Sequence, residues 1–199
     1  MIWWLRVHAV AASAASLLLC FLLAPLLAES SLPIPSLFSG NAAGVSVPLL
    51  LPVIPSCVLL YAMERTPEDL EAGSVRPLTR WWLAVLLITA LAALVFGLVE
   101  RQLLDFPLSF GVFRNLIGYL GAGLIIRRCT GSRYAPVAVM AIPLLCGLFG
   151  HGPGGRPYWW AWPLYDTNDR IALGAAAAGV LFCAGLTTLR RRSSRTAYA

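Results

Sequence analysis

Lysine is absent from this sequence: all 15 basic residues are arginine. A P-loop uses a lysine to reach the β- and γ-phosphates of a nucleotide, so this chain cannot bind ATP through a Walker A motif. Charge is sparse as well, because only 12% of the residues are charged and 59% are hydrophobic. A soluble domain usually carries about 25% charged residues. The sequence therefore predicts a membrane protein.

Paired cysteines and enzyme signatures are also missing. No C-x-x-C pair occurs, so the scattered cysteines are interpreted as small hydrophobic residues in helices rather than as disulfides or zinc ligands. The cysteines are Cys20, Cys57, Cys129, Cys146 and Cys183. The motifs H-E-x-x-H and G-x-S-x-G are absent, and a membrane enzyme would need at least two converging titratable groups. We expect no catalytic residues, no metal and no cofactor in this chain.

Six apolar runs are each close to the roughly 20 residues that a helix needs to cross a bilayer. They cover residues 7–28, 45–63, 81–99, 107–126, 134–150 and 171–189. Backbone groups in lipid must be paired within the chain, and these runs lack the alternation of barrel strands, so we predict helices. The first run also has features of a signal peptide, with Ala28 at a possible cleavage position; we treat it as a spanning helix. The predicted fold is all-α, with six transmembrane helices in a single domain.

The arginines predict the orientation of these helices, because positive charge collects on the cytoplasmic side. With the N-terminus inside, 11 of the 15 arginines fall on the inner side. These are Arg6, Arg65, Arg76, Arg80, Arg127, Arg128, Arg133, Arg190, Arg191, Arg192 and Arg195. We therefore predict a multi-pass protein of the cell membrane with both termini in the cytoplasm. The basic residues make no continuous face, so the net charge of +6 does not indicate nucleic-acid binding.

The longest predicted cytoplasmic loop covers residues 64–80. Thr66 can cap a short helix there, with Pro67 at its first position, and Gly73 can end it. This segment is either a solvated loop that anchors the next helix or a docking helix for a cytoplasmic partner. Its charged residues are Glu64, Arg65, Glu68, Asp69, Glu71, Arg76 and Arg80.

Proline and glycine mark two of the predicted helices. Pro48, Pro52 and Pro55 fall on one face of the second helix, which is expected to be kinked, or else broken where it lines a cavity. The fourth helix carries three glycines and the sixth a run of glycine and alanine at 174–179. Small residues let helices approach closely, either within the chain or in a dimer.

Arg114 is the most informative single residue. The apolar run after it is too short to span, so the fourth helix must begin near Pro107 and place Arg114 roughly 18 Å from the inner end of the helix, at about 1.5 Å per residue. A charge at that depth is costly and is expected to have a partner; Glu100 and Asp105 are the candidates. Either Arg114 snorkels to the outer headgroups or staples two helices, or it forms, with Asn115, a charged part of a substrate path or gate.

The predicted outer loop, residues 151–169, has a turn-rich half and an aromatic half. The aromatic residues Tyr158, Trp159, Trp160 and Trp162 are expected to lie in the interface as a re-entrant or flat segment. Asp166, Asn168 and Asp169 lack the remaining spacing of a calcium loop, so we expect Thr167 or Asp169 to cap the sixth helix. His151 stands alone and is not expected to bind metal.

A short loop helix opened by Glu64-Arg65 and followed by Pro77-Leu78-Thr79-Arg80 resembles the coupling segment of ABC-2-type (type V exporter-like) permeases. Arg114-Asn115 and the stretch from Trp159 to Pro163 resemble patterns of small actinobacterial permease-like proteins. This resemblance implies that residues 64–80 contact a separate ABC ATPase subunit, which carries the ATP and Mg. It also implies a second permease subunit, identical or different, and an outer gate region at residues 151–169.

The leading hypothesis from the sequence is thus the permease subunit of an ATP-driven exporter of a small molecule, peptide or lipid-like substrate. The alternative is a non-transporting scaffold or accessory subunit of a larger membrane complex, in which Arg114 is purely structural. An intramembrane enzyme is a third class, and it lacks a catalytic set.

Overall fold

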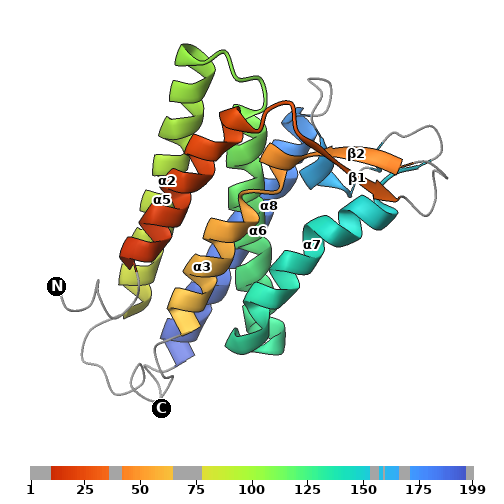
Figure 1. The fold of residues 1–199 in the computed structure, drawn as a ribbon. Coiled ribbons are helices and arrows are strands. Elements are labelled where there is room, and N and C mark those ends of the chain that lie inside the picture. The colour runs from red at the N-terminus through yellow and green to blue at the C-terminus, as the bar shows by residue number, and fades with distance from the viewer. Residues whose placement is uncertain are drawn as a thin grey trace.

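The computed structural model describes residues 10–35, 42–64, 78–152, 157–158, 160–165 and 171–195. Within these ranges the chain is mostly helical, and each of the six predicted apolar runs overlaps one α-helix (Figure 1). The helices are α2 Val10–Leu26, α3 Val53–Glu64, α5 Leu78–Leu103, α6 Ser109–Thr130, α7 Ala135–Phe149 and α8 Ile171–Arg195. The predicted fold is thus confirmed in its coarser form, a mostly helical chain; the described part also contains two β-strands.

Three helical stretches are long and apolar enough to cross a membrane. They are Val47–Glu64, Trp81–Leu103 and Ser109–Thr130, of 18, 23 and 22 residues. Three further apolar stretches, Val10–Leu26, Ala135–Phe149 and Gly174–Thr187, are shorter. The length and composition of the described helices therefore support membrane spans for three of the six predicted runs.

Helix α6 lies at the centre of the bundle and packs against α3, α5, α7 and α8 (Figure 1). Its crossing with α8 is close because glycine stands on both sides. A Cβ placed on Gly121 would meet the backbone of Leu181 and Phe182, and one placed on Gly185 would lie 2.9 Å from the carbonyl oxygen of Gly121. The predicted small residues thus serve packing within the chain at this crossing.

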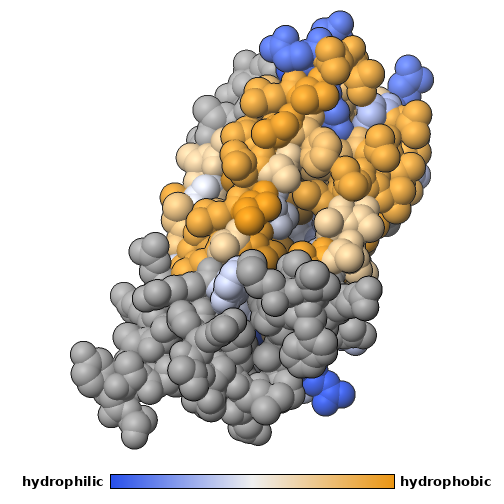
Figure 2. Space-filling view, turned by 90° about the vertical axis from the view of Figure 1, so that its left-hand side faces the viewer, coloured by the Kyte–Doolittle hydropathy of each residue, from blue (hydrophilic) through white to orange (hydrophobic). Residues whose placement is uncertain are grey.

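Helices α2 and α5 form an outer layer with an exposed apolar face. Only 22% of the Trp81–Leu103 stretch is buried. Figure 2 views the molecule from this side. Hydrophobic residues cover most of the described surface, and hydrophilic residues gather at its upper end. The exposed apolar residues of α2 and α5 include Leu18, Leu19, Leu22, Leu87, Ile88, Leu91, Val95, Leu98 and Val99.

The predicted second helix, 45–63, is interrupted. Val47–Leu49 is a 3₁₀ turn, η1, and the α-helix starts only at Val53. The prolines explain the interruption. Pro48 stands at the beginning of η1, Pro52 directly precedes α3, and Pro55 occupies the first turn of α3, where a missing backbone donor costs little. The predicted helix therefore begins with irregular turns at 47–52 within an 18-residue apolar stretch, and its regular α-helical part starts only at Val53.

A β-hairpin between the first two helices has no counterpart in the sequence prediction. Strand β1, Ser31–Pro35, pairs antiparallel with β2, Ala42–Ser46. Prolines in β1 are tolerated because both strands of a two-stranded sheet are edges. Ile34 lies against α7, where it fills the space that a side chain at Gly147 would occupy. Val45 packs with Cys146 and Leu164 in a second, smaller core.

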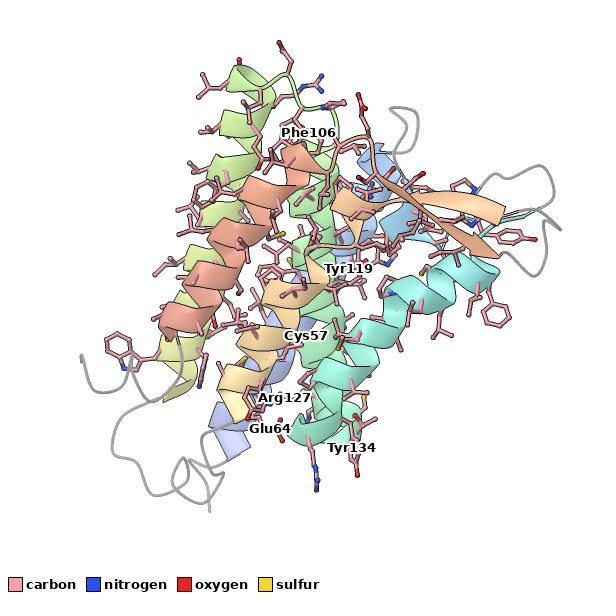
Figure 3. All side chains as sticks on the ribbon, in the orientation of Figure 1. Cys57, Glu64, Phe106, Tyr119, Arg127 and Tyr134 are labelled. Atoms are coloured by element: carbon pink, nitrogen blue, oxygen red, sulfur yellow. The ribbon has the colours of Figure 1, made fainter. Side chains whose placement is uncertain are left out.

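At the opposite end of the bundle, side chains bind the backbone of neighbouring helices. Arg127 Nη2 of α6 donates to the carbonyl oxygen of Met63, 3.4 Å away, in the last turn of α3. A cation suits the negative end of a helix. Cys57 Sγ donates to the carbonyl oxygen of Pro136 at 3.3 Å, which joins α3 to α7. Figure 3 shows Arg127 and Glu64 close together at this end.

Candidate functional site

Arg114 lies inside the bundle on α6, with only 2% of its surface exposed. Its Nε donates to Asn115 Oδ1 at 3.0 Å, and its Nη2 donates to the carbonyl oxygen of Tyr165 at 2.9 Å. A snorkelling arginine would keep its guanidinium at the surface, so that alternative is wrong. Arg114 instead links α6 by a hydrogen bond to Tyr165, in the segment that precedes α8. The predicted link was between two helices, and the observed one is between a helix and a loop.

Asn115 is fully buried and uses its side-chain amide to hold two distant segments together. Its Nδ2 donates to the carbonyl oxygen of Leu49 at 2.8 Å and to that of Pro163 at 3.0 Å. Leu49 ends η1, and Pro163 lies within the 3₁₀ turn η3, Trp162–Leu164. Because an amide nitrogen has only two hydrogens, both are used. We call Arg114, Asn115 and the carbonyls of Leu49, Pro163 and Tyr165 the polar node.

Glycines make room for the groups around the polar node. A Cβ on Gly118 would overlap the ring of Trp162, and a Cβ on Gly174 of α8 would lie 3.1 Å from Arg114 Nη1. The Trp162 ring also packs on Tyr119, with their centroids 5.3 Å apart. Tyr119 sits in the middle of the bundle in Figure 3. The node is therefore enclosed by α6, α8 and two 3₁₀ turns.

The two acids expected to pair with Arg114 have other surroundings. Glu100 is 6% exposed on α5, three residues before that helix ends. Asp105 is exposed in the following corner, where its φ of 49° is in the left-handed region that asparagine and aspartate tolerate better than most side chains. Neither accepts the hydrogen bonds that Arg114 donates from Nε and Nη2, which go to Asn115 Oδ1 and the carbonyl oxygen of Tyr165.

The predicted outer aromatic residues divide into two groups. Tyr158 and Trp160 are exposed, and their rings are nearly parallel with centroids 6.4 Å apart. Trp162 is buried at the polar node, so the chain turns from the surface into the bundle between Trp160 and Trp162. The hydroxyl of Tyr165 donates to the carbonyl oxygen of Tyr158 at 2.9 Å and ties the two parts together. Trp159 lies outside the described residues.

The remaining predicted features are only partly within the described chain. Glu64 is half-buried at the end of α3, and Arg80 falls in the first turn of α5. The other charged residues of the predicted coupling segment lie outside the described residues, as do the predicted caps of the sixth helix. These are Arg65, Glu68, Asp69, Glu71, Arg76, Thr167 and Asp169. His151 is buried and forms a β-bridge with Pro157.

Three participants of the polar node were not predicted: Leu49, Pro163 and Tyr165. Each contributes a backbone carbonyl, which every residue has, so no residue type could have pointed to them. Searched over the described ranges, no three His, Cys, Asp or Glu side chains gather in a way that could hold a metal ion.

The fork geometry of Arg114 gives a first testable prediction. Arg114→Lys keeps the positive charge but cannot reproduce the Nε and Nη2 bonds together. All donors of a lysine are on one nitrogen, whereas the two bonds of Arg114 come from two nitrogens in a fixed plane. We expect the free energy of unfolding to fall by about 1–2 kcal/mol, the scale of one lost buried hydrogen bond. Equilibrium unfolding in mixed detergent micelles measures it, and a stability equal to the parent would contradict the assigned geometry.

Comparison of the chain with protein-family models, with curated proteins and with solved structures finds no match in any of the three.

Proposed function

We propose that this protein is the membrane-spanning permease subunit of an ABC-2-type exporter, driven by a separate ATPase subunit. In this proposal it lies in the cell membrane with both termini in the cytoplasm and works with a second permease subunit. The transported molecule is a small molecule, a peptide or a lipid-like compound. The chain itself is not an enzyme, because the nucleotide and Mg belong to the partner.

One observation carries this proposal. The end of α3 at Glu64 and the start of α5 at Leu78 lie at the same end of the bundle (Figure 1). The segment 65–77 that joins them is the one whose sequence resembles a coupling helix. A force applied there acts on α3 and on α5. Helix α3 is preceded by the irregular turns at Val47–Pro52, whereas α5 is continuous for 26 residues. A helix of that length spans about 39 Å at 1.5 Å per residue.

In the proposed mechanism, closure of the ATPase subunits pushes on residues 64–80 and tilts α3 and α5. The polar node ties the irregular turns before α3 to the predicted outer segment, because Asn115 binds Leu49 and Pro163 at once. Movement of α3 would therefore be transmitted to the outer segment. The exposed apolar face of α2 and α5 would contact lipid or the second permease subunit, with the path opening at that interface.

The test is purification of the full chain from its native membrane in a mild detergent. We expect an ATPase subunit with a Walker A motif to co-purify, in an amount that changes with nucleotide. Reversing the charges of Glu64, Glu68 and Glu71 to arginine should reduce the amount recovered several-fold.

Glu29 provides the matched control, since it is an exposed acid at the opposite end of the bundle. Glu29→Arg should leave recovery of the ATPase unchanged. Recovery of the chain without any ATPase under these conditions, or equal loss with Glu29→Arg, would refute the proposal.

A second candidate, the non-transporting accessory subunit, is favoured by the composition of the polar node. The hydrogen bonds described for Arg114 and Asn115 go to each other and to backbone carbonyls of the same chain. Hydrogen bonds of this kind hold the segments of the fold together, which is a structural role. In this case the protein purifies in a stable complex with another membrane protein and without an ATPase.

A further inference from the structure

Glu100 is a buried carboxyl group that the proposed export mechanism does not use. It lies on α5, within a stretch apolar enough to span a membrane, and 6% of its surface is exposed. Its Oε2 atom is buried and accepts no hydrogen bond from the described chain. Negative charge at Oε2 is costly in that setting, because neither water nor a donor replaces the solvation of this atom.

The neighbouring helices explain why Glu100 points inward. Gly97, one turn earlier on α5, faces the backbone of Ser109: a Cβ there would be in ordinary contact with its carbonyl oxygen, 3.5 Å away. Residues three apart share a helix face, so Glu100 faces α6 as Gly97 does. Leu98 and Val99 are exposed on the opposite side. Ser109 is fully buried, and its hydroxyl also has no hydrogen-bond partner among the described residues.

Few charges face Glu100. From α2, the titratable group near Glu100 is the buried thiol of Cys20. From its own corner, Arg101 and Asp105 are exposed at the surface, where water screens them. α6 presents the uncharged Ser109. No described basic group is therefore placed to stabilise a carboxylate at position 100, and the neutral acid is the form that fits this environment.

The corner that covers Glu100 is held by a small number of backbone hydrogen bonds. Leu104 and Phe106 both donate to the carbonyl oxygen of Glu100, at 3.0 and 3.3 Å, and Ser109 donates to that of Phe106 at 3.4 Å. Phe106 is buried and caps this end of the bundle (Figure 3). Since α5 ends only three residues after Glu100, opening this corner would bring water to the carboxyl group.

We propose that Glu100 is a proton-binding site: the closed α5–α6 corner holds it as a neutral acid, and loss of the proton opens the corner. The ligand is a single proton, which leaves to water when the O–H bond breaks and leaves the carboxylate behind. Proton occupancy at this end of the bundle would thus control how firmly α5 is joined to α6. This site is independent of any ATPase.

Infrared difference spectroscopy on the protein in lipid vesicles tests the protonation. Glu100→Gln keeps size and shape but removes the acid. We expect the parent-minus-variant spectrum at neutral pH to contain the carbonyl band of a protonated carboxylic acid, which disappears reversibly as the pH is raised. Glu29→Gln and Asp105→Asn, which alter exposed acids at the same end, are the controls and should leave the protonated-acid band in place. A carboxylate band for Glu100 at neutral pH, or a band that ignores pH, would overturn the proposal.

Hydrogen exchange tests the link to the corner. At alkaline pH the amides of residues 104–109 should exchange at least several-fold faster in the parent than in Glu100→Gln, while the amides in the centre of α6 exchange equally in both. At neutral pH the two proteins should match. Equal exchange at alkaline pH would show that ionisation does not open the corner and would refute that part of the proposal.

Discussion

Replacing Asn115 with aspartate should destabilise the protein strongly, because the buried amide of Asn115 joins two distant segments. The substitution keeps the shape of the side chain but removes both amide donors. A carboxylate donates nothing, and its protonated form donates only once, so at least one of the carbonyls of Leu49 and Pro163 loses its partner at every pH. A buried acceptor without a partner costs ~1–3 kcal/mol. We expect the free energy of unfolding to fall by about 2–5 kcal/mol.

The measurement is equilibrium unfolding in mixed micelles, followed by tryptophan fluorescence and far-ultraviolet circular dichroism. Thr130→Ala is the matched control on the same helix. It removes an exposed hydroxyl that donates to Ile126 at 3.0 Å, and a surface change of this kind stays within about 0.5 kcal/mol. If Asn115→Asp and Thr130→Ala were equally mild, Asn115 would not join the two segments.

Gly121→Ala should separate α6 from α8. The added methyl would overlap the backbone of Leu181 and Phe182. Backbone cannot rotate away as a side chain can, so the whole of α8 must shift. Overpacking of this kind costs about 1–3 kcal/mol, occasionally more, and we expect a loss near 3 kcal/mol. The loss occurs although alanine favours helix by about 1 kcal/mol over glycine.

Gly179→Ala is the control, because a Cβ at Gly179 meets nothing within 4 Å. The same change there should be neutral or stabilise by about 0.5–1 kcal/mol through helix propensity alone. Unfolding in mixed micelles measures both variants, and limited proteolysis reports whether α8 is released. Equal effects of the two alanines would mean that α6 and α8 do not cross at Gly121.

The number and positions of the helices could be read from the sequence, because each apolar run must bury or shield its backbone and does so as a helix. The beginning of α6 near Pro107 followed in the same way, from the length needed to carry Arg114 into the bundle. The hairpin could not be read, since Ser31–Pro35 has two prolines and six residues separate it from its partner strand. Its pairing depends on contacts with α7.

The sequence by itself determined that Arg114 would be deep in the bundle and that glycine would let helices approach closely. Only the tertiary structure decided what Arg114 and Asn115 hold. Their partners are carbonyls of residues 49, 163 and 165, far away in the chain and of no distinctive type. The length of an apolar run is a local property that can be counted in the sequence. The partner of a buried donor depends instead on which backbone carbonyl the packing of other helices brings within about 3 Å.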